Sequence, residues 1–210
     1  RNYDWKLDAF DFADAVNSCM LSEVNAWVHY AAKRYYGMMG DGTRGIANGV
    51  ITKRGYILSH FAKYVTGTTR IQHTFRDDSN VLKGSSYVSV TGDSVVVMVI
   101  NSSDNAYDLT FDLPFYTKKA QRILTTTSVS MSVANYDYAT ETLRPKIEVP
   151  ASSVTTYVFV KNSDRPASFM TGPPMYHSKI ETQSPTTSGY GTEFRLSGTT
   201  GTFIHDAPLL

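Results

Sequence analysis

The chain has 210 residues, a hydrophobic content of 41% and a formal net charge of +1. This length suffices for one large domain or two small ones, and the hydrophobic content permits a packed core. A net charge so close to zero gives no sign of a nucleic-acid or membrane partner at the level of the whole chain. No apolar run approaches the roughly 20 residues that a membrane-spanning helix needs.

The first residues and the single cysteine bound the cellular setting. Arg1-Asn2-Tyr3-Asp4 lacks the composition of a signal peptide, which predicts either a protein that is not exported or a start that is not the natural one. Cys19 is the sole cysteine, so a disulfide within the chain is excluded.

The first predicted element is a helix over Asp8–Leu21. Apolar residues recur there at spacings of three and four: Phe10, Ala13, Val16 and Met20. Cys19 lies on this apolar side, so we expect a buried, inert thiol. Asp8, Asp11 and Asp14 are spaced by three, which is conceivable for a metal site, but a solvated helix face is the expectation we favour.

The next stretch, Asn25–Gly42, reads NAWVHYAAKRYYGMMGDG. Its bulky first part, Asn25–Tyr30, predicts a strand that is covered on both faces. A basic and aromatic run follows: Lys33, Arg34, Tyr35 and Tyr36. The glycines of Gly37–Gly42 then break regular structure.

This stretch carries the chemistry that is visible in the residues. Tyrosine and tryptophan faces suit the C–H faces of a sugar ring, and the planar fork of the Arg34 guanidinium suits a carboxylate. Together they predict an acidic carbohydrate ligand. The alternative interpretation is that Trp27 and Tyr30 are core residues and that Arg34 is a solvated surface charge.

A second helix is predicted over Lys53–Val65. Thr52 is its candidate N-cap, and Gly67 can end it. Its apolar stripe consists of Ile57, Leu58, Phe61, Ala62 and Val65. His60 lies beside this stripe, where a hydrogen-bonded interfacial histidine is more common than a metal ligand.

After Gly67 the composition changes to short runs rich in Val, Ile, Thr and Tyr. The predicted strands are Thr69–Phe75, Ser86–Thr91, Ser94–Asn101, Ala106–Leu113, Ala120–Thr127, Pro145–Val149 and Ser153–Val160. The continuous apolar run Val95–Met98 predicts a central strand. Short strands separated by regular turns favour an antiparallel β-sandwich.

From Asn162 the chain becomes rich in Ser, Thr, Pro and Gly, which is typical of a linker or of the start of a further module. Thr192–Leu196 and Thr200–Ile204 could pair as a hairpin.

The chain holds no nucleotide-binding loop, zinc-protease motif, paired cysteines or serine-nucleophile motif. Its five histidines are dispersed, and Glu23 is expected to be structural. We therefore expect no catalytic residue, no metal ligand and no cofactor in this chain.

Several segments resemble a known family. Asn25-Ala26-Trp27-Val28, the run Lys33–Gly37 and the KRGY and SVTTYVF signatures, in this order and spacing, look like glycoside hydrolase family 30. The resemblance is strongest to its glucuronoxylanase subfamily and covers roughly residues 5 to 161. It implies the closing part of a (β/α)8 barrel at 1–66 and an antiparallel side β-sandwich at 67–161, with 162–210 as a linker or further module.

The resemblance implies cleavage of the β-1,4-xylan backbone of glucuronoxylan with retention of configuration, through two glutamates. Both glutamates would lie upstream of Arg1. Because about one of eight barrel strands is present, the resemblance implies that a companion polypeptide supplies the rest of the barrel. A polymeric substrate implies a secreted, extracellular or periplasmic enzyme, with no nucleic-acid or membrane partner.

By resemblance, Arg34 pairs with the carboxylate of the 4-O-methylglucuronate branch of xylan, and Tyr36 hydrogen-bonds the same group. Tyr30 occupies the position of a stacking aromatic residue that is usually tryptophan, so its stacking area is smaller. The loop also carries a segment, Arg44–Gly49, that is extra relative to the family, and His29 replaces a common tyrosine.

Two alternatives stay open at this point. One is another activity on the same scaffold, such as a β-glucosidase, a β-1,6-glucanase or a hydrolase of unbranched xylan, against which Arg34 and Tyr36 argue. The other is a non-catalytic carbohydrate-binding protein, since the chain alone lacks the two carboxylates.

Overall fold

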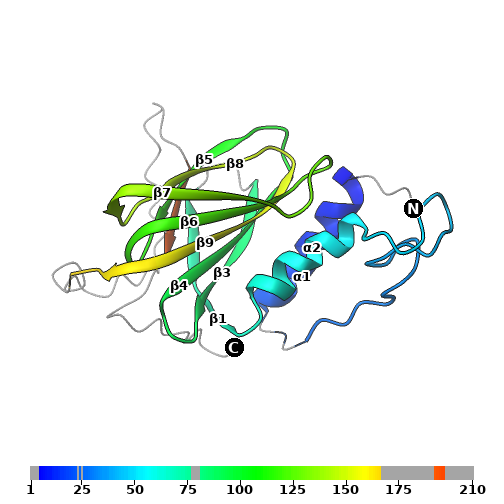
Figure 1. Cartoon of the computed structure of the whole chain (residues 1–210), viewed down its shortest axis with the longest axis horizontal. Coiled ribbons are helices and arrows are strands. Elements are labelled where there is room, and N and C mark those ends of the chain that lie inside the picture. Colours follow the sequence, from blue (N-terminus) through cyan, green and yellow to red (C-terminus); the bar gives the residue numbers. More distant parts are fainter. Residues whose placement is uncertain (1–4, 23, 25, 77–80, 167–191, 197–210) are drawn as a thin grey trace.

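The computed structural model describes residues 5–22, 24, 26–76, 81–166 and 192–196. These residues form three layers: two helices, a six-stranded sheet and a four-stranded sheet (Figure 1). The helices cover one face of the six-stranded sheet, and the four-stranded sheet lies against its other face. The described part of the chain is thus mostly β, with helices on one side.

The helices begin and end close to where the apolar periodicity predicts. A π-helical turn at Trp5–Ala9 leads into α1, Phe10–Leu21, and α2 spans Lys53–Tyr64. Neither helix is long and apolar enough to cross a membrane, and the same holds for every helix in the described residues.

The first turn of α2 is capped as predicted. The Thr52 hydroxyl accepts a hydrogen bond from the Gly55 amide at 3.2 Å and donates one to the Gly37 carbonyl at 2.6 Å. Gly67 follows the helix with a φ of 77°, a left-handed conformation that glycine adopts without a steric penalty. The cap and the ending glycine were both correctly predicted.

The six-stranded sheet is antiparallel throughout. In spatial order its strands are β1 (Thr68–Ile71), β3 (Leu82–Ser89), β4 (Ser94–Asn101), β9 (Ser153–Asp164), β6 (Phe115–Thr125) and β7 (Ser132–Thr142). The four-stranded sheet contains β2 (His73–Arg76), β10 (Thr192–Leu196), β5 (Tyr107–Asp112) and β8 (Lys146–Val149). There β10 runs parallel to β5, and the other pairs are antiparallel.

Strand β4 explains why one run of the sequence is apolar without alternation. Val95, Val97 and Val99 belong to the core between the two sheets. Val96, Met98 and Ile100 belong to the core beneath the helices. A strand that is buried on both faces needs apolar residues at every position, which confirms the predicted central strand.

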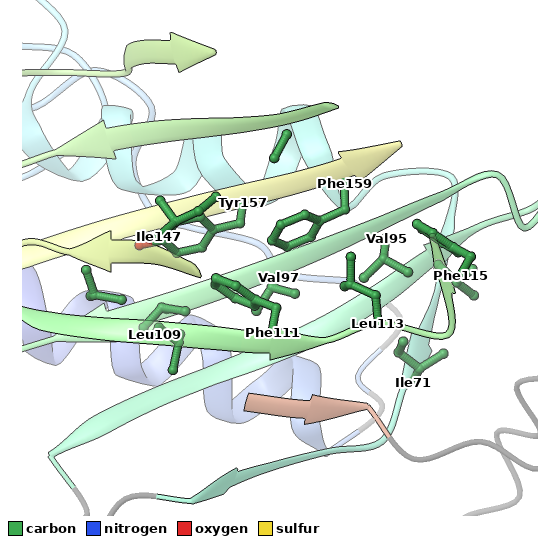
Figure 2. Packing of buried hydrophobic residues seen from close by; sticks show 14 of the residues in the cluster. Ile71, Val95, Val97, Leu109, Phe111, Leu113, Phe115, Ile147, Tyr157 and Phe159 are labelled. Carbon is green, nitrogen blue, oxygen red and sulfur yellow. The ribbon is translucent and has the colours of Figure 1, made fainter. Parts of the chain in front are cut away.

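The core between the sheets is built around aromatic side chains (Figure 2). The ring of Phe111 on β5 lies 4.8 Å from that of Tyr157 and 4.7 Å from that of Phe159, both on β9, between ring centroids. The buried Tyr157 hydroxyl donates a hydrogen bond to the Glu148 carbonyl at 2.8 Å, so its polar atom is satisfied. The two-layered sandwich predicted from the strand pattern is therefore present, although its four-stranded sheet is mixed because β10 runs parallel to β5.

The core beneath the helices contains one histidine. His60 is fully buried, with Nδ1 2.7 Å from the Thr156 hydroxyl and Nε2 2.8 Å from the Thr125 hydroxyl. These bonds join α2 to β9 and β6. The prediction of a hydrogen-bonded interfacial histidine is confirmed.

Several strands differ from the prediction: β6, for example, begins at Phe115 rather than at Ala120, and β9 continues to Asp164 rather than ending at Val160. The predicted strand Thr69–Phe75 is two strands, β1 and β2, which enter different sheets on either side of Gln72. The strand predicted at Ser86–Thr91 begins earlier, at Leu82. Strand β7 was not predicted, because as an edge strand it pairs on one side only and its outer positions are polar.

The prediction of a strand at Asn25–Tyr30 is wrong. Residues 26–30 form no strand, and Val28 and Tyr30 are 91% and 74% exposed rather than covered on both faces. A parallel strand is held by neighbours on both sides, and none of the described strands lies beside this segment. Asn25 itself lies outside the described residues.

The carboxyl-terminal predictions fall partly outside the structure. Thr192–Leu196 is the strand β10, which pairs with β2 and β5. The predicted strand Thr200–Ile204 and the stretch 167–191 lie outside the described residues.

Candidate functional site

The basic and aromatic stretch folds into a loop that is anchored on the start of α2. The Arg34 amide donates to the Met39 carbonyl and the Met39 amide to the Ala32 carbonyl, both at 3.0 Å. The Thr52 amide donates to the Met38 carbonyl at 3.0 Å. We call the segment from Tyr30 to Thr52 the tyrosine loop. Its backbone is fixed by its own hydrogen bonds and by the helix cap.

Two glycines allow this loop to fold back on itself. A Cβ at Gly37 would lie 2.3 Å from the Ala31 carbonyl oxygen, and one at Gly40 would lie 2.1 Å from the Ala47 carbonyl oxygen. Both contacts are with backbone atoms, so any larger residue would push the loop apart. The glycines therefore serve close backbone approach.

Three tyrosine rings meet on the surface of this loop. The Tyr35 and Tyr36 centroids lie 4.8 Å apart with planes at 85°, and the Tyr30 and Tyr36 centroids lie 6.5 Å apart with planes at 36°. Tyr30 is 74% exposed, which excludes the interpretation of this residue as part of the core. The three rings, here called the tyrosine cluster, present aromatic surface to solvent.

Arg34 is exposed beside this cluster. A hydrogen bond with the Tyr30 side chain raises the pKa of the Arg34 guanidinium above its ordinary value, with smaller contributions from Tyr36 and Asp41. The group is therefore charged at every working pH. Among the described residues Arg34 forms no ion pair within 4.0 Å, so none of their carboxylates neutralises its charge.

The structure thus brings together the three residues that the sequence suggested for substrate binding: Tyr30, Arg34 and Tyr36. A nearby acid, Asp41, is engaged by its own turn, where it accepts hydrogen bonds from the Thr43 hydroxyl at 2.7 Å and the Thr43 amide at 3.1 Å. The hydroxyl bond is the main reason that the pKa of Asp41 is lowered.

Arg54 connects the tyrosine loop to the π-helical turn and to α1, a role that was not predicted from the sequence. Its Nε donates to Asp8 at 2.7 Å, a terminal nitrogen pairs with the other Asp8 oxygen, and the second terminal nitrogen donates to the Tyr36 carbonyl at 3.2 Å. The guanidinium also lies over the Phe12 ring, at 5.4 Å. This one side chain links the π-helical turn, α1 and the loop.

A signal for this role was present in the sequence. Arg54 occupies the first turn of α2, where the helix dipole disfavours a positive charge. A carboxylate partner offsets that effect, and Asp8 supplies it. Asp8 is 13% exposed at its side chain, so the prediction of a solvated face is wrong for this residue.

The aspartate series does not form a metal site. Asp14 pairs with Lys83, whose Nζ lies 2.6 Å away, while Asp11 is exposed. Within the part of the chain that the structure describes, no group of three or more His, Cys, Asp or Glu side chains could hold a metal ion. Cys19 is half-buried.

The segment before the tyrosine loop contains two ring nitrogens that have no hydrogen-bond partner in the described residues. Trp27 and His29 contact Phe12 edge-on, at 6.2 Å and 5.2 Å between centroids. Their Nε1 and Nε2 atoms are buried yet have no hydrogen-bond partner in the described residues. Burial is the main cause that lowers the pKa of His29.

Large apolar side chains are exposed between the end of α1 and the start of α2. They are Leu21, Val24, Val28, Tyr30, Met39, Val50 and Ile51. We call these residues the apolar face. Isolated exposed apolar residues are ordinary, and seven between the end of α1 and the start of α2 make this part of the chain the candidate for an interaction surface.

Comparison with known proteins adds a relationship. The chain is 30% identical over 164 residues to glucuronoxylanase XynC of Bacillus subtilis (strain 168), an alignment that covers 72% of this chain and 34% of the relative. The chain therefore spans about a third of the length of that curated relative. No family model matches the chain.

Two solved structures share its fold. One is a family 30 endoxylanase from Clostridium papyrosolvens C71, with a TM-score of 0.61 and 22% identity over 72% of this chain and 38% of that one. The other is Xyn30A, a family 30 subfamily 8 xylanase from Clostridium acetobutylicum, with a TM-score of 0.61 and 21% identity over 76% of this chain and 40% of that one.

The fold is therefore that of part of a glycoside hydrolase family 30 xylanase. Sequence and structure relatives together show that the chain is similar to the carboxyl-terminal portion of a glucuronoxylanase of this family. The family resemblance read from the sequence is confirmed.

Proposed function

We propose that this chain is the part of a retaining glucuronoxylan endo-1,4-β-xylanase that recognises the acidic branch of the substrate. The observation that carries the proposal is Arg34, an exposed guanidinium beside the rings of Tyr30 and Tyr36. The likeness to glucuronoxylanase XynC supports xylan as the polymer. The whole enzyme's reaction is inferred for a longer assembly that contains this chain.

The physical basis of recognition is a matched geometry. A guanidinium presents parallel N–H donors that pair with both oxygens of a carboxylate, and such charge-assisted pairs are stronger than neutral hydrogen bonds. The interaction with Tyr30 that raises the pKa of Arg34 keeps the guanidinium charged beside the aromatic rings before the ligand arrives. The Tyr30 ring would stack on a sugar, and the Tyr36 hydroxyl would donate to the uronate.

The cleavage step requires groups from outside this chain. A retaining glycosidase uses two carboxyl groups about 5–5.5 Å apart, one as nucleophile and one as acid/base. We assign both to glutamates on the barrel that this chain would complete, with residues 1–66 as its closing part and 67–161 as the side sandwich. Residues 162–210 are assigned to a linker or a further module, and the enzyme acts outside the cell on its polymeric substrate.

The apolar face supports a companion that covers it. Val28 is 91% exposed, and the buried Trp27 Nε1 and His29 Nε2 have no partner in the described residues. Polypeptide laid along residues 26–30 would pair the backbone as a strand and bury these side chains. We infer that the remainder of the barrel, on the same or another polypeptide, occupies this position.

The proposal is tested by measuring kcat/KM on glucuronoxylan and on unbranched xylo-oligosaccharides for Arg34→Ala, made in the complete enzyme that contains this chain and the rest of the barrel. We expect a loss of roughly tenfold or more on the branched substrate and little change on the unbranched one, because only the branch carries a carboxylate. Arg34→Lys should not restore the activity, since an ammonium cannot form the planar fork.

Other outcomes point to other functions. An equal loss on both substrates would contradict branch recognition and favour a different family 30 activity on this scaffold. Binding of the oligosaccharides without cleavage, in material whose mass spectrum contains every polypeptide of the assembly, would favour a non-catalytic carbohydrate-binding protein.

A further inference from the structure

A second arginine contacts the tyrosine cluster. The guanidinium carbon of Arg44 lies 4.7 Å from the centroid of the Tyr35 ring, within the range of a cation–π interaction. Arg44 is exposed, like Arg34. The cluster therefore carries two cationic side chains.

Arg44 is presented by a tightly bonded turn. The Gly42 amide donates to the Ile46 carbonyl at 3.1 Å, and the Ile46 amide donates to the Thr43 carbonyl at 3.0 Å. Between these bonds Arg44 has a φ of 51°, in the left-handed region. The Gly49 amide closes the turn on the Gly40 carbonyl at 2.9 Å. Hydrogen bonds within the tyrosine loop thus fix the backbone of Arg44.

The two arginines use different rings. Arg34 bonds with Tyr30, whereas Arg44 stacks on Tyr35, and the Tyr36 ring contacts both of those tyrosines. Because Arg34 interacts with Tyr30 while Arg44 lies over a different ring, Tyr35, the two guanidinium forks are offered at two places on the tyrosine cluster. Arg44 is therefore placed for a second anionic group.

Stacking leaves Arg44 able to bind an anion. The cation–π contact uses the flat face of the guanidinium, while its N–H donors lie in the plane and point outward. The ring thus orients the fork without satisfying its hydrogen bonds.

We propose that Arg44 is a specificity-determining residue that binds a second carboxylate of an acidic saccharide whose first carboxylate is held by Arg34. The inference rests on the function proposed above and extends it: the site prefers xylan chains that carry more than one uronate branch. Both contacts are exposed, so the preference weakens as salt increases.

The test compares Arg44→Asn with Lys33→Gln. Asparagine tolerates the left-handed conformation better than most residues, so the first change removes the guanidinium with little backbone penalty. Lys33 is an exposed cation of the same loop that the structure does not place over a ring, so the second change controls for net charge. The purified protein is titrated with xylo-oligosaccharides that carry no, one or two uronate branches.

We expect Arg44→Asn to weaken binding of the doubly branched ligand by about fivefold at low salt, with the singly branched and unbranched ligands unchanged. Lys33→Gln should leave the ratio between ligands as in the wild type. The inference is overturned if Arg44→Asn changes none of the affinities, changes all of them equally, or matches Lys33→Gln. It is also overturned if the wild type binds the two branched ligands equally tightly.

The same titration separates this inference from the proposed function. Arg34→Ala should weaken the singly branched ligand, and failure of that result refutes branch recognition by Arg34. If Arg34→Ala weakens binding of the singly branched ligand while Arg44→Asn changes no affinity, branch recognition by Arg34 is supported and the second contact at Arg44 is refuted.

Discussion

At the scale of single residues, His60 shows how a polar group can be held inside an apolar interface. Both ring nitrogens have hydroxyl partners, so the neutral ring is satisfied on both sides. Burial lowers the pKa of His60 to about 3, because the charged form would lose its hydration. The helix layer is thus attached to the sheet by a histidine that must stay neutral.

This histidine predicts an acid-sensitive stability. Since the unfolded chain binds the proton near pH 6.5 and the folded chain does so near pH 3, the contribution is complete above about pH 6.5 and declines as the pH falls toward 3. The His60 part of this loss between pH 8 and pH 5 should be about 2 kcal/mol in the free energy of unfolding. Urea unfolding at the two pH values measures it.

The control for this prediction is His60→Gln, which lacks the titrating group. Its loss between pH 8 and pH 5 should be smaller than that of the wild type by the His60 share, although its stability at pH 8 is also lower. His73, whose pKa is lowered to about 4 mainly by burial, continues to titrate in both proteins. An identical pH dependence in the variant would refute the assignment to His60.

At the scale of elements, the start of α2 joins the helix to the tyrosine loop. Thr52 caps the helix and also donates to Gly37 in the loop, and Arg54, two residues later, binds the Tyr36 carbonyl. The rings of the tyrosine cluster therefore take their position from the end of a helix rather than from a free loop. A binding surface held by a helix end is better ordered than one held by loop contacts alone.

We predict that Thr52→Ala lowers the free energy of unfolding by about 1–2 kcal/mol, because it removes the cap and leaves the Gly37 carbonyl without its donor. Thr52→Ser, which retains the hydroxyl, should be close to the wild type. Hydrogen exchange should also accelerate at the Arg34 and Met39 amides in the alanine variant. Equal stability of the two variants would show that the cap contributes nothing.

At the scale of the whole molecule, the β-sandwich buries its apolar side chains, whereas the segment before α2 leaves many of its own exposed. The two sheets bury an apolar core of aliphatic and aromatic side chains (Figure 2), and the helices cover the outer face of the larger sheet. The apolar face, by contrast, remains exposed to solvent. In the described residues, the two faces of the larger sheet are therefore covered, whereas large apolar side chains between the end of α1 and the start of α2 are not.

This asymmetry predicts that the chain alone associates through its apolar face. Val28→Ser should reduce self-association in sedimentation velocity at micromolar concentration, with little change in the free energy of unfolding, because Val28 is 91% exposed. Val90→Ser is the matched control, since Val90 is 83% exposed but lies in the β3–β4 turn of the sandwich. Equal effects of the two variants would argue against a specific face.

The sequence alone was enough to predict the features that depend on residues close together in the chain. The spacing of apolar residues located α1 and α2, the hydroxyl of Thr52 marked a helix start, and the unbroken apolar run of β4 marked a strand buried on both faces. The composition of the tyrosine loop likewise indicated aromatic side chains beside an arginine, whereas carboxylate binding by that arginine stays a prediction. Each signal lies within a few residues, where periodicity and capping act.

Only the tertiary structure decided the features that depend on distant partners. The Asp8–Arg54 pair joins residues 46 positions apart, the break at Gln72 sends β1 and β2 to different sheets, and Arg44 finds Tyr35 through a turn. Residues 26–30 carry the pattern of a strand yet form none, because a strand exists only beside another strand. Backbone pairing and charge pairing are non-local, so a linear pattern can supply the groups but not their partners.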